Sequence, residues 1–119
     1  RLHERGSLTL PQTVDVRHVA QAATAMLRAA LDCFARFDAG QAGSVINADA
    51  RIDAEFKAIL RQLITYMMED PRTISDSVDI LWIARAIERI GDHAKNIAEN
   101  VVYIVEGRDI RHSSREQGA

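Results

Sequence analysis

The sequence has little of what marks secreted, membrane-spanning or nucleic-acid-binding proteins. Its 119 residues include one cysteine, Cys33, so no disulfide can form within the chain, which suits a reducing cytoplasm. No apolar run approaches the roughly 18 residues that a membrane span needs, and no signal peptide is visible. The formal net charge of −2 provides no basic field for nucleic acid. We therefore expect one small cytoplasmic domain, and a first residue of Arg1 suggests a piece of a longer protein.

Proline and glycine are also scarce, and where they occur they divide the chain. Residues 1–13, with one glycine, one proline and several polar residues, are interpreted as a linker or an extended arm. Gly40 and Gly43 predict the break after a first helix. Pro71 ends a second helix, because the residue before a proline is pushed out of the helical region. Gly107 is a natural stop for a third helix.

Between these breaks the apolar residues recur at steps of three and four, which is the period of one helix face. The pattern predicts helices near residues 14–38, 42–69 and 75–106, and no alternating pattern predicts a strand. The connections are short, so successive helices should be antiparallel. We therefore expect an all-α protein: an antiparallel three-helix bundle of long helices over residues 14–107, with a flexible C-terminal tail over residues 108–119.

The predicted third helix carries one apolar row that should face the core, namely Ile83, Ile87, Ile90, Ala94, Ile97, Val101 and Ile104. A helix turns by about 100° per residue, so the other faces can be placed by counting. With Ile90 as the core direction, Glu88, Asp92 and Glu99 point to the opposite side, and Asn96 lies at the edge of that strip. His93 points away from the strip and is interpreted as a surface histidine.

Two pairs of carboxylates stand one helical turn apart. They are Asp49 and Asp53 on the second predicted helix, and Glu88 and Asp92 on the third. Paired oxygen ligands at this spacing can hold a hard metal ion, but acidic residues at four-residue steps are also common on solvated helix faces. Aspartate is a poor mid-helix residue, so Asp49 and Asp53, at the margin of the core stripe, are either partnered by arginine or bound to something.

Antiparallel packing would bring the early part of the second helix beside the later part of the third, so all four carboxylates could share one surface. Such an arrangement resembles di-iron helical bundles, although the histidine of their Glu-x-x-His pairs is missing. No nucleophile constellation and no glycine-rich phosphate loop is present in the sequence. We therefore expect a protein that is not an enzyme.

Several segments resemble the PhoU family of bacterial phosphate-uptake regulators. The resemblance rests on ARAIERIGDHAKNIAENVVYIVEG (84–107), and it continues through FARFD (34–38), RQLITYMMEDPRTI (61–74) and GRDIRH (107–112). Proteins of this family contain two repeats, each a three-helix bundle, and this chain is similar to the second, C-terminal repeat. The resemblance implies that the family's acidic pairs correspond to Asp49 and Asp53, and to Glu88 and Asp92. Asn96 and Glu99 extend that implied metal site.

The resemblance also implies a function. Members of the family are cytoplasmic adaptors, peripheral to the inner membrane through their partners. They couple the ATPase subunit of the phosphate-specific ABC transporter to a sensor histidine kinase, and they repress the phosphate-starvation response. Some carry iron clusters or other divalent metals, so iron, magnesium, manganese or calcium is the implied cofactor here.

Three alternatives remain open from the sequence. The first is a regulatory adaptor with an accessory metal site, and the second is a metal-storage or metalloenzyme bundle built on the same carboxylates. The third is a purely structural helical oligomer. A homo-oligomer, most simply a dimer, is expected in addition, because three helices cannot turn every apolar residue inward. The residues that should stay outside are Leu60, Ile64, Trp82 and Val102.

Overall fold

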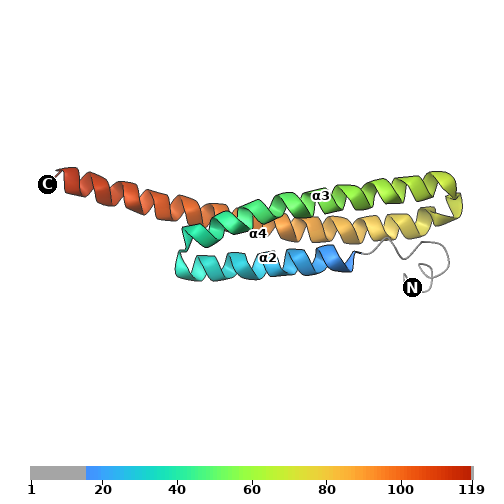
Figure 1. Ribbon diagram of the computed structural model, residues 1–119, viewed down its shortest axis with the longest axis horizontal. Helices are drawn as coiled ribbons and strands as arrows, with labels where there is room; N and C mark the ends of the chain where they lie inside the picture. Colours follow the sequence, from blue (N-terminus) through green and yellow to red (C-terminus); the bar gives the residue numbers. More distant parts are fainter. Residues whose placement is uncertain (1–15, 119) are drawn as a thin grey trace.

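The computed structural model describes residues 16–118, and the side chains of residues 16–107. Three α-helices, α2 (Arg17–Arg36), α3 (Ala39–Glu69) and α4 (Ile74–Gly118), follow one another in antiparallel succession (Figure 1). A short 3-10 turn, η1 (Pro71–Thr73), joins the last two helices. The molecule is a rod with extents of 72 × 22 × 16 Å. No strand occurs among the described residues, so the expected all-α three-helix bundle is confirmed.

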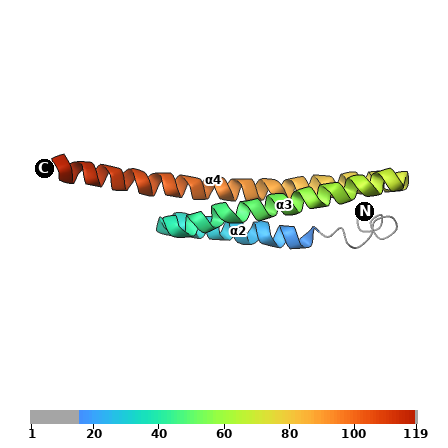
Figure 2. The ribbon, with the colours of Figure 1, turned by 45° about the horizontal axis from the view of Figure 1, so that its top comes forward.

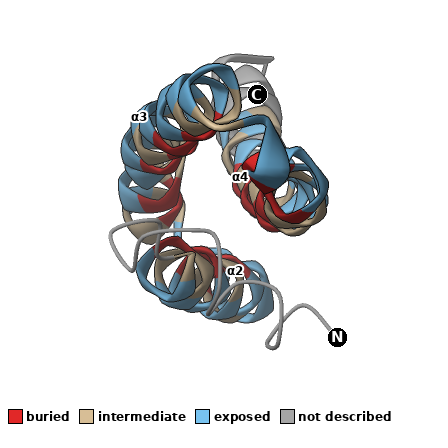
Figure 3. Cartoon of the chain, turned by 90° about the vertical axis from the view of Figure 1, so that its right-hand side faces the viewer, coloured by how far each residue is buried: buried red, intermediate tan, exposed pale blue. Residues whose placement is uncertain are grey.

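The core is a narrow seam between the three helices, and the buried faces turn toward one another when the rod is viewed along its length (Figure 3). On each helix the buried residues recur at alternating steps of three and four, as in a left-handed bundle. Many of them are small. On α2 they are Val19, Ala23, Met26, Ala30 and Cys33, and on α4 they include Ala84, Ile87, Gly91, Ala94, Ala98 and Val101.

The core direction of α4 differs from the one predicted. Ile90 is 37% exposed and Ile104 is 36% exposed, whereas Ala84 and Ala98 are buried, so the choice of Ile90 as the core direction is wrong. The reason is the size of the side chains. Alanine and glycine let the helix backbones approach closely, so of the predicted isoleucines Ile87 is buried, while Ile83 and Ile97 pack only partly against the core.

The break between α2 and α3 comes before the two glycines that were expected to make it. Phe37 ends α2 in the left-handed conformation, with φ 52° and ψ 44°, and its N–H bonds to the carbonyls of Cys33 and Phe34. Asp38 then caps α3 by accepting a hydrogen bond from the N–H of Gln41 at 3.0 Å. Gly40 and Gly43 lie inside α3, because a capping aspartate begins the helix before them.

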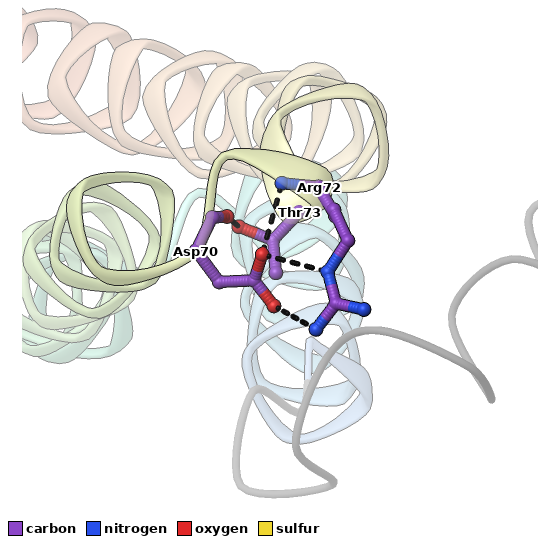
Figure 4. A network of polar contacts seen from close by, with 3 residues as sticks. All are labelled: Asp70, Arg72 and Thr73. Carbon is purple, nitrogen blue, oxygen red and sulfur yellow. Dashed lines mark hydrogen bonds and ion pairs between the residues drawn. The ribbon is translucent and has the colours of Figure 1, made fainter.

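The turn between α3 and α4 is fixed by Asp70 (Figure 4). Its carboxylate accepts hydrogen bonds from the backbone N–H of Arg72 at 3.1 Å and from the guanidinium at 3.0 and 2.9 Å. The hydroxyl of Thr73 donates to the Asp70 carbonyl at 2.8 Å. These hydrogen bonds from Arg72 lower the pKa of Asp70. Helix α3 ends at Glu69, two residues before Pro71, as the sequence predicts.

Helix α4 runs through Gly107 to Gly118, so the predicted stop at Gly107 is wrong, and residues 108–118 of the expected tail are helical. No proline interrupts this stretch, and a helical glycine alone costs only about 1 kcal/mol relative to alanine. The C-terminal part of α4 therefore extends past the α2–α3 turn (Figures 1 and 2). The predicted arm, residues 1–13, lies outside the described residues.

No described helix combines the length and the apolar composition that would let it cross a membrane.

Gly91 offers a test of the close packing between α3 and α4. A Cβ atom at Gly91 would lie 3.4 Å from Oδ1 of Asp49 and 3.5 Å from Cγ2 of Ile52, so alanine fits but a longer side chain does not. Gly91→Ala should change the free energy of unfolding by no more than about 1 kcal/mol, in the stabilising direction. Gly91→Leu should lower that free energy by about 1–3 kcal/mol, because it overpacks the seam.

The matched control is Gly107→Leu, because nothing lies within 4 Å of a Cβ atom at Gly107. Urea unfolding of the three variants measures the effect. If Gly91→Leu were as stable as Gly107→Leu, the close approach of the two helices would be wrong.

Candidate acidic site between α3 and α4

Asp49 occupies a position in the buried row of α3 where an apolar residue would be expected. Asp49 continues the buried row of α3, which is Ala42, Val45, Ile52, Phe56, Ile59 and Leu63, at the same alternating steps of four and three. Its side chain is only 15% exposed. Gly91 on α4 makes the room, since the Asp49 carboxylate lies where a larger residue at 91 would project. Because Gly91 has no side chain, the carboxylate of Asp49 fits between α3 and α4.

Two lysines lie against the aspartates of α3. The Nζ atom of Lys95, on α4, is 3.8 Å from Oδ2 of Asp49. The Nζ atom of Lys57, one turn further along α3, is 3.2 Å from Oδ2 of Asp53. From the sequence these aspartates are either partnered by arginine or bound to something, and among the described residues the distances pair them with lysine. Lys95 crosses from one helix to the other, whereas Lys57 pairs within its own helix.

The electrostatics of Asp49 show which other carboxylates lie nearby. Burial raises the pKa of Asp49, and the negative charges of Asp92, Asp53 and Glu99 raise it further, while Lys95 lowers it. Burial disfavours the charged form of a carboxyl, and so does a like charge close by. Asp49 therefore lies among carboxylates from both helices and is destabilised as an anion by its surroundings.

Glu88 repeats this situation at the other end of the site. Burial raises its pKa, followed by the charge of Asp92, and the guanidinium of Arg85 opposes the shift. The negative charge of Asp53 raises the pKa of Glu88 as well, and a side-chain interaction with Asp53 adds to this. The charge of Asp53 on α3 thus acts on Glu88 on α4, and the charge of Asp92 on α4 acts on Asp49 on α3.

The structure therefore brings both predicted carboxylate pairs to one side of the α3–α4 seam. Glu99 belongs with them electrostatically, and Asn96 is exposed on the same helix. His93 is exposed, as expected. We call the set of Asp49, Asp53, Glu88, Asp92 and Glu99 the acidic face. Sequence reasoning missed Lys57, and it considered Lys95 only as a neighbour of Glu88 and Asp92 on the same helix, not as the partner of Asp49 on α3.

The chemistry of this face is that of an oxygen-ligand site. Carboxylates from two rigid helices match the ligands that magnesium, calcium, manganese and iron accept. Within the described part of the chain, no three His, Cys, Asp or Glu side chains are already gathered into a set that could hold a metal ion. The residue types fit a hard divalent cation, and in the arrangement described the ammonium groups of Lys57 and Lys95 neutralise the aspartates instead.

Comparisons with known proteins identify a family and several relatives. The PhoU domain family matches residues 16–101. The chain is 56% identical over 99 residues to a phosphate-specific transport system accessory protein PhoU homolog of Pseudomonas aeruginosa, which covers 83% of this chain and 41% of that protein. It is 44% identical over 102 residues to the phosphate-specific transport system accessory protein PhoU of Escherichia coli. That match covers 86% of this chain and 42% of the E. coli protein.

A solved structure shares the fold. The crystal structure of PhoU from Pseudomonas aeruginosa superposes with a TM-score of 0.78 at 52% sequence identity, covering 83% of this chain and 47% of the crystallised one. The chain thus spans about two fifths of the length of the curated relatives it matches.

The raised pKa values predict how stability depends on pH. A carboxyl whose pKa is higher in the folded state than in the unfolded state loses folding free energy when it ionises. For Asp49 and Glu88 the loss begins near their ordinary values of 3.8 and 4.5 and is complete above their raised pKa values. Asp49→Asn and Glu88→Gln should therefore be more stable than the wild type at pH 7, and this advantage should shrink at pH 4.

Urea unfolding at the two pH values, with a chelator present, measures this difference. Glu69→Gln is the control, because Glu69 is an exposed carboxylate at the end of α3. A variant of Asp49 that is less stable than the wild type at pH 7 would contradict the account.

Proposed function

This chain belongs to the PhoU family, and we propose on that basis that it serves as an accessory component of phosphate-specific transport. Two relatives that are 56% and 44% identical to it carry that description in their names. The finer proposal is a cytoplasmic adaptor, peripheral to the inner membrane, that couples the transporter's ATPase subunit to a sensor histidine kinase and represses the phosphate-starvation response. The observation that carries the proposal is the match to this family over residues 16–101, most of the chain.

The described surface supports a role in protein binding rather than catalysis. Near the tip of the α3–α4 hairpin, several large apolar side chains are exposed: Ile64 at 43%, Met68 at 81%, Ile74 at 46%, Val78 at 39% and Trp82 at 70%. Exposed apolar groups that recur at steps of four along adjacent helices are typical of surfaces that meet another protein. Of the residues expected to stay outside, Ile64 and Trp82 are exposed, while Leu60 and Val102 are partly buried. The homo-oligomer stays a prediction.

We propose further that the acidic face binds a divalent cation. Asp49, Asp53, Glu88 and Asp92 would hold it, with Asn96 and Glu99 at the margin, and the ion would supply positive charge that draws the two helices together. The supporting observation is Asp49 itself, an ionisable group in a packed seam whose surroundings oppose its charge. Ionisable groups with strongly shifted pKa values are often found at functional sites. The alternative of a storage or redox bundle draws on the same carboxylates and lacks the histidine ligands of such proteins.

The adaptor role can be tested in a bacterium that lacks its own gene of this family and carries a phosphate-starvation promoter fused to a reporter. Expression of this chain should restore repression of the reporter at high phosphate. Trp82→Asp should abolish the repression if the hairpin tip contacts a partner, whereas Tyr103→Ala, which also alters an exposed aromatic residue, should not. An unchanged reporter with the wild-type chain, together with no capture of the transporter ATPase subunit by the purified protein, would contradict the proposal.

The metal role can be tested with Mn²⁺, because the electron paramagnetic resonance signal of the free ion is lost on binding. The wild type should take up Mn²⁺. Glu88→Gln combined with Asp53→Asn should weaken binding at least roughly 10-fold, since loss of a single supporting contact in a metal site already has that effect. Glu69→Gln should leave binding unchanged. Equal weakening by the Glu69 variant, or no uptake by the wild type, would exclude a site on the acidic face.

A further inference from the structure

Lys95 occupies a particular place in the acidic face. It lies three residues after Asp92 and four before Glu99, so all three side chains leave α4 on the same side. Its ammonium reaches across the seam to within 3.8 Å of Asp49 on α3. The Lys95 side chain is 39% exposed and that of Asp49 is 15% exposed, so the contact lies at the edge of the packed core.

The chemistry of lysine matters for what happens at this contact. An ammonium is a compact point charge on a flexible four-carbon stem, so it can leave Asp49 for solvent without disturbing the backbone. Arginine would bind a carboxylate in a planar, two-pronged arrangement that is harder to displace.

We propose that Lys95 is the resident counter-ion of Asp49: it neutralises the seam when no metal is bound, and a divalent cation must displace it in order to bind. The first half of this inference stands on the contact alone, and the second half rests on the proposed metal role of the acidic face. Displacement makes the cation compete with a tethered ammonium. The protein then binds the ion more weakly than its carboxylates alone would, and the α3–α4 contact survives without it.

The experiment compares Lys95→Met with Lys57→Met. Methionine keeps an unbranched apolar stem in each case and removes the ammonium. Lys57 is the comparison: it pairs with Asp53 within α3, but it is 62% exposed, so its ion pair contributes little and its ammonium returns to solvent at little cost. The measurements are the thermal midpoint in the presence of a chelator and the dissociation constant for Mn²⁺, both on the full chain.

Lys95→Met should lower the midpoint without metal by roughly 4 °C and tighten Mn²⁺ binding by about 10-fold, and Lys57→Met should have a much smaller effect on both. The loss of stability should vanish in an Asp49→Asn background, because the ammonium then has no carboxylate to neutralise. This double variant separates the loss of the charge pair from a general loss of packing by the methionine.

Each outcome decides something. An unchanged midpoint and unchanged Mn²⁺ affinity in Lys95→Met would overturn the proposal even if the wild type binds Mn²⁺. Destabilisation that persists without Asp49 would overturn the counter-ion role. If no variant and no wild-type protein binds Mn²⁺, while the midpoint falls only when Asp49 is present, the counter-ion role stands and both the metal role and displacement are wrong.

Discussion

The structure depends on one close contact, where α3 and α4 meet at Gly91. The glycine lets the helices approach, and the space beside it holds the carboxylate of Asp49 instead of an apolar side chain. The alanines before and after Gly91 on α4 keep the same spacing along the seam. The approach of the two acidic pairs and the contact of Lys95 with Asp49 follow from this register. A larger residue at position 91 would separate the helices and expose Asp49, and the acidic face would lose its geometry.

Much of the fold could be predicted from the sequence. Three-and-four periodicity predicts the three helices, and Pro71 predicts the end of α3. Antiparallel packing predicts that the two acidic pairs approach each other, in line with the charge effects between them. Three features could not be found this way. The break at Phe37 depends on a left-handed residue that no pattern marks, and α4 continues through Gly107 because nothing opposes it. The core direction of α4 is set by buried small residues. A periodicity judged from the large apolar residues alone does not include them.

The carboxylates of the candidate site could be predicted from the sequence, but the contact of Lys95 with Asp49 could not. Side-chain spacing within one helix reveals acidic pairs, but the contact of Lys95 with Asp49 joins two helices and requires their register. The acidic face also shows a conflict between stability and function. Burial and like charges oppose the ionisation of Asp49 and Glu88, so the fold holds two carboxylates that lower its own stability at neutral pH. Natural proteins tolerate such groups at sites where a ligand relieves the repulsion.

Asp49 lies in the seam among charges that oppose its ionisation, and we propose that a divalent cation relieves this. A site-resolved titration of the Asp49 carboxyl carbon by NMR, without and with Mg²⁺, tests it most directly. The account predicts that the carboxyl titrates above its ordinary value of 3.8 in the absence of Mg²⁺ and at a clearly lower pH in its presence. A carboxyl that titrates at or below 3.8 without the ion, and does not respond to it, would contradict the account.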